Sequence, residues 1–102
     1  MAFDNTRERY ASFGVATSLS YGLVNAFWDI LDNYLKGVFP LSSTLTFHLI
    51  KKGNSISIQY LDAKGELSIT FDYNIPFDPF FPRTIKLIDD NGIETLLLPY
   101  EL

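Results

Sequence analysis

The single histidine of this 102-residue chain, His48, is the side chain best suited to general acid–base chemistry. The register that the turns predict places His48 beside Gln59 and Gln59 beside Ser68, in one row across three strands. A serine activated by a histidine can act as a nucleophile. Adjacent strands lie about 4.8 Å apart, so His48 and Ser68 would be roughly 9 to 10 Å apart, beyond hydrogen-bond reach. We therefore expect a solvated polar sheet face and predict no catalytic residue.

Two pairs of acidic residues could supply metal ligands. Asp89 and Asp90 precede an Asn-Gly pair, but adjacent strand residues point to opposite faces, whereas calcium loops space their ligands at alternate positions. Asp29 and Asp32 are neighbours on one helix face, but no histidine or second acidic pair is spaced to complete a site. The glycine-rich phosphate-binding motifs are also missing from the sequence. We predict neither a metal nor a cofactor.

Residues 74–83 (NIPFDPFFPR) are the most informative segment for binding. Three prolines in this segment preclude a central strand and favour a stiff, extended crossover. Its phenylalanines either close the open end of the core, which we favour, or remain exposed as a docking patch. Trp28, at the edge of the predicted helical stripe, has the same two readings. The candidate partner contacts are Phe77, Phe80, Phe81 and Trp28.

Turn chemistry predicts the strands that would position these residues. Asn91-Gly92 favours a two-residue type I′ turn and pairs Leu87 with Leu96. Gly53-Asn54 favours a type II′ turn and pairs Phe47 with Tyr60. Both registers place apolar side chains together on one face of the sheet.

The third turn is predicted as a four-residue loop, residues 62–65. That length pairs Ile58 with Ile69 and keeps the apolar face continuous, whereas a three-residue loop would reverse every side chain after it. One face is then apolar and the other polar, as expected for an antiparallel sheet covered on one side. We expect Phe47, Ile58, Ile69 and Leu87 in the core.

A helix over residues 19–36 is the predicted cover of the apolar face. Leu23, Phe27 and Ile30 belong to an apolar stripe of helical period, with Ser18 or Ser20 as the N-cap and Gly37 after the last turn. Residues 10–16 alternate loosely and are predicted as a first strand. The fold class is therefore α+β, a mainly antiparallel sheet of order β-α-β-β-β-β-β with one amphipathic helix on one face.

Composition bounds the protein's class. A 47% hydrophobic content and 102 residues suit one α+β domain spanning residues 1–102. Eight basic and twelve acidic residues give a net charge of −4, which disfavours nucleic acid as a partner. No apolar run is long enough to span a membrane and no signal segment is recognisable, so we expect a cytoplasmic protein without membrane contact. The lack of cysteine excludes disulfides and thiol chemistry.

Four short motifs run in order along nearly the whole chain: residues 9–16 (RYASFGVA), 28–32 (WDILD), 85–90 (IKLIDD) and 95–101 (TLLLPYE). In these motifs the chain resembles the bacterial family called domain of unknown function 960, from low-GC Gram-positive bacteria. The chain departs from that family at residues 55–66, where the family tends to carry a polar stretch rich in His, Gln and Glu. The resemblance implies a cytosolic, single-domain bacterial protein and transfers no catalytic residue.

Three functional hypotheses follow. The first is a non-enzymatic protein-interaction module, with another protein or a second copy of itself (a homodimer) as the partner, because a β-rich domain with an open strand edge can pair with another chain. The second is a small-ligand-binding protein or weak enzyme that uses a pocket between helix and sheet, or the row of His48, Gln59 and Ser68. The third is an acidic inhibitor of a nucleic-acid enzyme, carried on mobile DNA.

Overall fold

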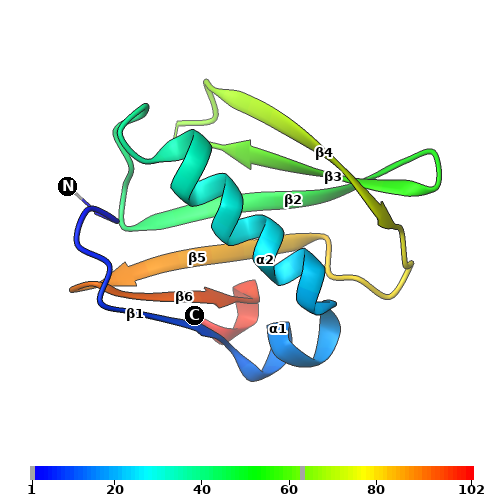
Figure 1. The fold of residues 1–102 in the computed structure, drawn as a ribbon, viewed down its shortest axis with the longest axis horizontal. Helices are drawn as coiled ribbons and strands as arrows, with labels where there is room; N and C mark the ends of the chain where they lie inside the picture. The colour runs from blue at the N-terminus through cyan, green and yellow to red at the C-terminus, as the bar shows by residue number, and fades with distance from the viewer. Residues whose placement is uncertain (1, 63) are drawn as a thin grey trace.

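A six-stranded sheet with helices on one face forms the molecule, seen in a computed structural model that describes residues 2–62 and 64–102 (Figure 1). The elements in chain order are β1 (Glu8–Ala11), α1 (Phe13–Ser18), α2 (Tyr21–Ile30), η1 (Leu31–Leu35), β2 (Thr44–Lys52), β3 (Ser55–Leu61), β4 (Ser68–Pro76), β5 (Thr84–Asp90), β6 (Ile93–Leu97) and η2 (Pro99–Glu101). The strand order is β1-β6-β5-β2-β3-β4. Only β1 and β6 run parallel among these pairs, so the predicted α+β class with a mainly antiparallel sheet is confirmed.

Two of the predicted hairpins have the register that their turns favour. Asn91 and Gly92 both have positive φ, 52° and 91°, as a type I′ turn requires, and Leu87 pairs with Leu96. Gly53 has a φ of 63°, and the β2–β3 pairing puts Phe47 opposite Tyr60 and His48 opposite Gln59.

The third register prediction is wrong by two residues. Leu61 pairs with Ser68, so the β3–β4 connection covers residues 62–67 instead of 62–65, although Ala63 lies outside the described residues. The carboxylate of Asp62 accepts a hydrogen bond from Glu66 N–H, and Asp62 N–H donates to Leu67 O, which closes the longer loop. A shift of two residues keeps every side chain on its predicted face, so the apolar face survives the error.

The predicted first strand is also only partly correct. Strand β1 ends at Ala11, because the hydroxyl of Ser12 accepts a hydrogen bond from Val15 N–H and starts the short helix α1. Gly14 belongs to this helix, at a place where an added Cβ would lie 2.7 Å from Leu98 Cδ1. The α1 turn therefore packs closely on the end of the chain.

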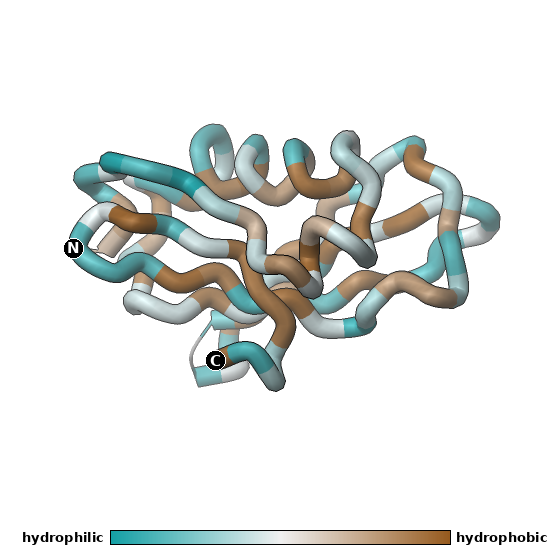
Figure 2. The backbone as a smooth tube through the Cα atoms, turned by 90° about the horizontal axis from the view of Figure 1, so that it is seen from below, coloured by the Kyte–Doolittle hydropathy of each residue, from teal (hydrophilic) through white to brown (hydrophobic). Residues whose placement is uncertain are grey.

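The main helix begins and ends close to the prediction. Ser20 caps α2 by accepting from Leu23 N–H, one turn of π-helix (η1) continues it, and Gly37 follows with a φ of 74°. Hydrophilic residues lie on the outer side of the helix and hydrophobic ones on the side facing the sheet (Figure 2). None of the helices in the described part of the chain is long and apolar enough to cross a membrane.

The core lies between α2 and the central strands. Phe27 of the helix meets Phe47 of β2 edge-to-face, with ring centroids 5.3 Å apart. Phe47, Ile58 and Leu87 are fully buried, as predicted. Ile69 is only half-buried, because it lies on the edge strand β4, at the margin of the helical cover.

Candidate functional site

The loop between β4 and β5 holds the three phenylalanines that the sequence singles out. Phe77 and Phe81 are half-buried and pack against the core. Phe80 is 90% exposed, so its ring projects into solvent. Each of the two interpretations therefore applies to part of the segment: the rings of Phe77 and Phe81 cover the core, and the ring of Phe80 is accessible to a partner.

Hydrogen bonds fix the backbone that presents Phe80. Asp78 accepts at its side chain from Phe80 N–H, 2.9 Å, and at its backbone oxygen from Phe81 N–H, 3.0 Å. Phe77 N–H donates to Asn54 O, 2.9 Å, which ties the loop to the β2–β3 turn. Pro79 precedes Phe80, and Pro82 follows Phe81. Because both prolines restrict the backbone, Phe80 is held on a preorganised loop, which lowers the entropy cost of binding a partner.

A hollow of about 450 Å³ lies directly beside this loop. We call it the phenylalanine hollow; its lining residues are Leu49, Ile50, Lys51, Phe77, Pro79, Phe81, Pro82 and Arg83. The ammonium of Lys51 lies 5.6 Å from the ring centroid of Phe77. The hollow therefore combines an apolar floor with two cationic side chains, in a chain whose net charge is −4.

Trp28, the fourth candidate contact, does not join the loop. It is half-buried on α2, and the guanidinium of Arg9 stacks over its ring at 4.8 Å from the centroid. Arg9 belongs to β1, which lies at the opposite edge of the sheet from β4. Trp28 is thus part of the β1 side of the molecule, not of the phenylalanine hollow.

The row of His48, Gln59 and Ser68 is partly assembled. His48 pairs with Gln59 as predicted, but Gln59 pairs with Thr70, and its amide donates diagonally to Ser68 Oγ at 2.8 Å. The ring of His48 has its Nδ1 3.4 Å from the hydroxyl of Thr84 instead. Because the serine is held by an amide and the histidine by a threonine, the row lacks the nucleophile–base contact that catalysis needs.

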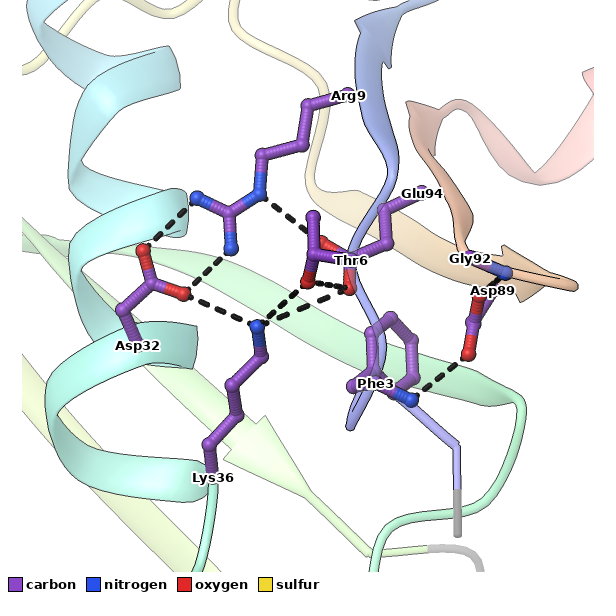
Figure 3. Close-up of polar contacts among 8 residues, drawn as sticks. All are labelled: Phe3, Thr6, Arg9, Asp32, Lys36, Asp89, Gly92 and Glu94. Carbon is purple, nitrogen blue, oxygen red and sulfur yellow. Dashed lines mark hydrogen bonds and ion pairs between the residues drawn. The ribbon is translucent and has the colours of Figure 1, made fainter.

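The most extensive polar cluster, which the sequence did not predict, lies between the end of the main helix and the strands β1 and β6 (Figure 3). Its centre is Glu94 on β6, whose side chain is 0% exposed. Glu94 accepts from Thr6 Oγ1 at 2.7 Å and from Arg9 Nε at 2.9 Å, and Lys36 Nζ lies 3.8 Å away. Arg9 also forms a two-pronged ion pair with Asp32. We call these residues the Glu94 cluster: Thr6, Arg9, Asp32, Lys36 and Glu94.

The signal for this cluster was present in the predicted hairpin. Pairing Leu87 with Leu96 also pairs Asp89 with Glu94, and alternation puts both acids on the same face as the core leucines. An acid on a core-facing position requires a partner when it is buried. Only the approach of β1, which the sequence leaves unplaced, identifies that partner as Arg9.

Charges in the cluster stabilise one another. The hydrogen bond from Arg9 lowers the pKa of the Asp32 carboxyl, although desolvation opposes the shift. The same contact with Asp32 raises the pKa of Arg9. Since each carboxylate is engaged by a cation, the cluster is suited to holding β1, β6 and the helix together rather than to proton transfer.

The remaining acidic candidates have structural partners. Asp29 Oδ2 lies 3.3 Å from the hydroxyl of Tyr73, whose pKa is raised to about 12 by burial and by the charge of Asp29. Asp89 accepts from Gly92 N–H in its turn and from Phe3 N–H. Within residues 2–62 and 64–102, no group of three or more His, Cys, Asp or Glu side chains is placed to hold a metal ion.

The space between helix and sheet, which a ligand pocket would need, is occupied by the core. Leu23, Phe27 and Ile30 of α2 are fully buried against it. This tight packing disfavours a helix–sheet pocket, which is one of the two sites that the second functional hypothesis names.

Known proteins are similar to this chain over nearly its whole length. The family model described as "Staphylococcal protein of unknown function (DUF960)" matches residues 8–101. A crystal structure of a protein of unknown function from Enterococcus faecalis is similar over 100% of this chain and 96% of that chain, with 35% sequence identity and a TM-score of 0.94. No curated protein matches the chain.

Proposed function

Because the chain belongs to this staphylococcal family of unknown function, DUF960, whose name assigns no activity, we propose from its own surface that it is a non-enzymatic protein-interaction module. The observation that carries the proposal is Phe80, 90% exposed on a hydrogen-bonded loop beside the phenylalanine hollow. Exposed aromatic rings next to a pocket are typical of residues that dominate binding energy. We also propose a cytoplasmic location, since a chain without cysteine needs no oxidising compartment.

The chemistry of the phenylalanine hollow specifies the partner. Lys51 and Arg83 line an otherwise apolar surface, so a complementary segment carries an apolar side chain flanked by carboxylates. Neutralising these two cations also favours an acidic segment over a basic one, even though the chain as a whole is acidic. The proposed ligand is therefore an acidic, apolar stretch of another protein.

Selection from a random peptide library displayed on phage tests this proposal. We expect the enriched peptides to carry Asp or Glu beside an aliphatic or aromatic residue. Phe80→Asp and Lys51→Glu should each weaken binding of a selected peptide about tenfold, which corresponds to about 1.4 kcal/mol. Neither change should unfold the protein, because both side chains are exposed.

Phe13→Asp is the matched control. Phe13 is 83% exposed, but it lies at the start of α1, away from the hollow lining. This variant should bind the peptide like the wild type. Enriched peptides that bind Phe80→Asp as tightly as the wild type, or an absence of any enrichment, would contradict the proposal.

A further inference from the structure

Strand β4 is one edge of the sheet: β3 lies on one side, and no strand formed by residues 2–62 or 64–102 lies on the other (Figure 1). It is nine residues long and contains no lysine, and its one proline, Pro76, is its last residue. Long edge strands are usually protected against pairing by lysines, internal prolines or a covering segment. From Ser68 to Tyr73, β4 contains neither a lysine nor a proline that would protect it in this way.

The pairing pattern shows which backbone groups of β4 face outward. Leu49 N–H donates to Arg83 O, so the backbone of Leu49 faces β5 and not β3. Its partner Ile58 therefore directs its backbone to β4, where it meets Phe71. Alternation along β4 then turns the backbone N–H and C=O groups of three residues toward the free edge: Ser68, Thr70 and Asp72.

The large apolar side chains of β4 all lie on one face of the sheet, the face that packs against the core. Ile69, Phe71 and Tyr73 lie on the core face but are only half-buried, since they are at the margin of the helical cover. Tyr34, which is 51% exposed, packs on Phe71 with ring centroids 5.1 Å apart. The edge thus presents a hydrogen-bonding strand beside a partly exposed apolar ledge.

We propose that β4 is a self-pairing interface, at which β4 of a second copy adds antiparallel and in register about Thr70. This pairing sets Ser68 opposite Asp72, Ile69 opposite Phe71 and Thr70 opposite itself. Apolar residues then meet apolar residues on the helix side, and hydroxyls meet a carboxylate or each other on the polar side. The two sheets join edge to edge, with both helices on the same face.

Two features select this register. Centring the pair on Asp72 would place two carboxylates directly opposite each other, which is destabilising. Centring it on Phe71 would extend the pairing to Asn74, where an irregularity between the pairs Ser55–Pro76 and Ile56–Tyr73 bends the strand. Of these three registers, only the one about Thr70 both stays within the regular stretch and avoids like charges.

A second copy is the occupant because the strand is complementary to itself. A two-fold interface needs the same patch to supply donors and acceptors to its own image. Residues 68–72 do so in both hydrogen bonding and side-chain type. This inference is independent of the proposed partner at the phenylalanine hollow, which β4 does not line.

Sedimentation equilibrium over a range of concentrations tests the self-pairing. We expect the wild type to move from 11.6 kDa toward twice that mass as concentration rises. Thr70→Lys sets two lysines opposite each other and should weaken dimerisation about fivefold. Ser68→Lys sets lysine opposite Asp72 of the second copy and should strengthen it about fivefold, an effect that high salt removes. Thr70→Val is the uncharged control: it keeps a β-branched side chain and loses only the hydroxyl contact, so its dimerisation should change much less than that of Thr70→Lys.

A cysteine variant gives a second readout, because a covalent bond traps a pair of copies that associate only briefly. The chain has no cysteine, so Thr70→Cys should form a covalent dimer on oxidation, because paired strand residues lie within disulfide reach. Thr44→Cys, exposed at the start of β2, should remain monomeric on a non-reducing gel. A wild type that is monomeric at all concentrations, or a Thr70→Lys variant that dimerises unchanged, would overturn the inference.

Discussion

The two edges of the sheet are built in opposite ways. Edge strand β1 is four residues long, and the Glu94 cluster connects it to β6 and to the end of the main helix. Edge strand β4 is nine residues long and leaves both backbone groups and half-buried apolar side chains at its margin. We call the β1 edge, which is short and held by paired charges, the closed edge. We call the β4 edge, which keeps backbone groups that a further strand can satisfy, the open edge.

The end of the chain adds to the closure at β1. Glu101 accepts hydrogen bonds from Ser12 Oγ at 2.6 Å, Gly14 N–H at 3.1 Å and Leu98 N–H at 2.8 Å. These donors lie on two segments far apart in sequence, so one carboxylate fastens the start of α1 to η2. Paired charges thus hold a short edge strand in place, whereas unpaired backbone groups along a long edge strand can bind another strand.

Removing the central cation of the closed edge should have the largest effect. Arg9→Met leaves the buried carboxylate of Glu94 with only Thr6 and the more distant Lys36, and it removes the stacking on Trp28. We expect the free energy of unfolding to fall by about 3 kcal/mol, measured by urea denaturation. Lys52→Met, which removes an exposed, solvent-screened ion pair with Asp72 near the β4 edge, should cause a much smaller loss of stability. Equal losses in the two variants would show that the Glu94 cluster stabilises its edge no more than an exposed ion pair does.

Gly92→Ala should have the next largest effect. Its φ is 91°, and an added Cβ would lie 2.5 Å from Asn5 O, the backbone that leads into β1. We expect a loss of roughly 2 kcal/mol, from the left-handed conformation and the displaced backbone together. Gly65→Ala is the matched control, because its φ is 70° but no atom lies within 4 Å of the added Cβ. That variant should lose only about 1 kcal/mol, and a loss as large as that of Gly92→Ala would show that the contact with Asn5 contributes nothing.

The smallest effect should appear as a difference in acid sensitivity. Arg9 lowers the pKa of Asp32 below its ordinary value of 3.8, so the stabilisation is present above that value and is lost as the pH falls below it. Asp32→Asn should therefore be less stable than the wild type at pH 7, with the gap narrowing below about pH 4. Urea denaturation at pH 7 and below about pH 4 measures the difference in stability between the variant and the wild type. A difference that stays constant would argue against the ion pair as its source.

Asp72 provides the comparison at the other edge. Lys52 and Ser57 lower its pKa, but the group is exposed and solvent screens its ion pair. At pH 7, the loss of stability relative to the wild type should thus be smaller for Asp72→Asn than for Asp32→Asn. Added salt should reduce the loss for Asp72→Asn further.

Local rules predicted most of the sheet but not its closed edge. Asn91-Gly92 and Gly53-Asn54 were sufficient for two registers because each turn acts on adjacent residues. The loop after Leu61 was predicted two residues too short, since the side chain of Asp62 stabilises a turn that length alone does not indicate. Ser12 was assigned to a strand although it caps a helix.

The candidate site divides in the same way. The exposure of Phe80 follows from its place in a proline-rich loop, which the sequence displays directly. The contact of Arg9 with Glu94 does not follow from the sequence in this way, because it joins residues that are 85 positions apart through a parallel strand pair. Only the three-dimensional topology shows that Trp28 belongs with Arg9 and not with the phenylalanines.

The parallel pairing of β1 with β6 has a consequence for synthesis on the ribosome. Arg9 is made 85 residues before Glu94, an interval of roughly 4 to 17 s at ordinary elongation rates of about 5 to 20 residues per second. Hairpins such as β2–β3 form within about 1 to 10 μs once both strands have emerged. The sheet therefore grows from its middle, and its first-made strand waits for seconds before it can dock. The rate of translation, and not the speed of folding, sets how long the nascent chain carries β1 without a partner.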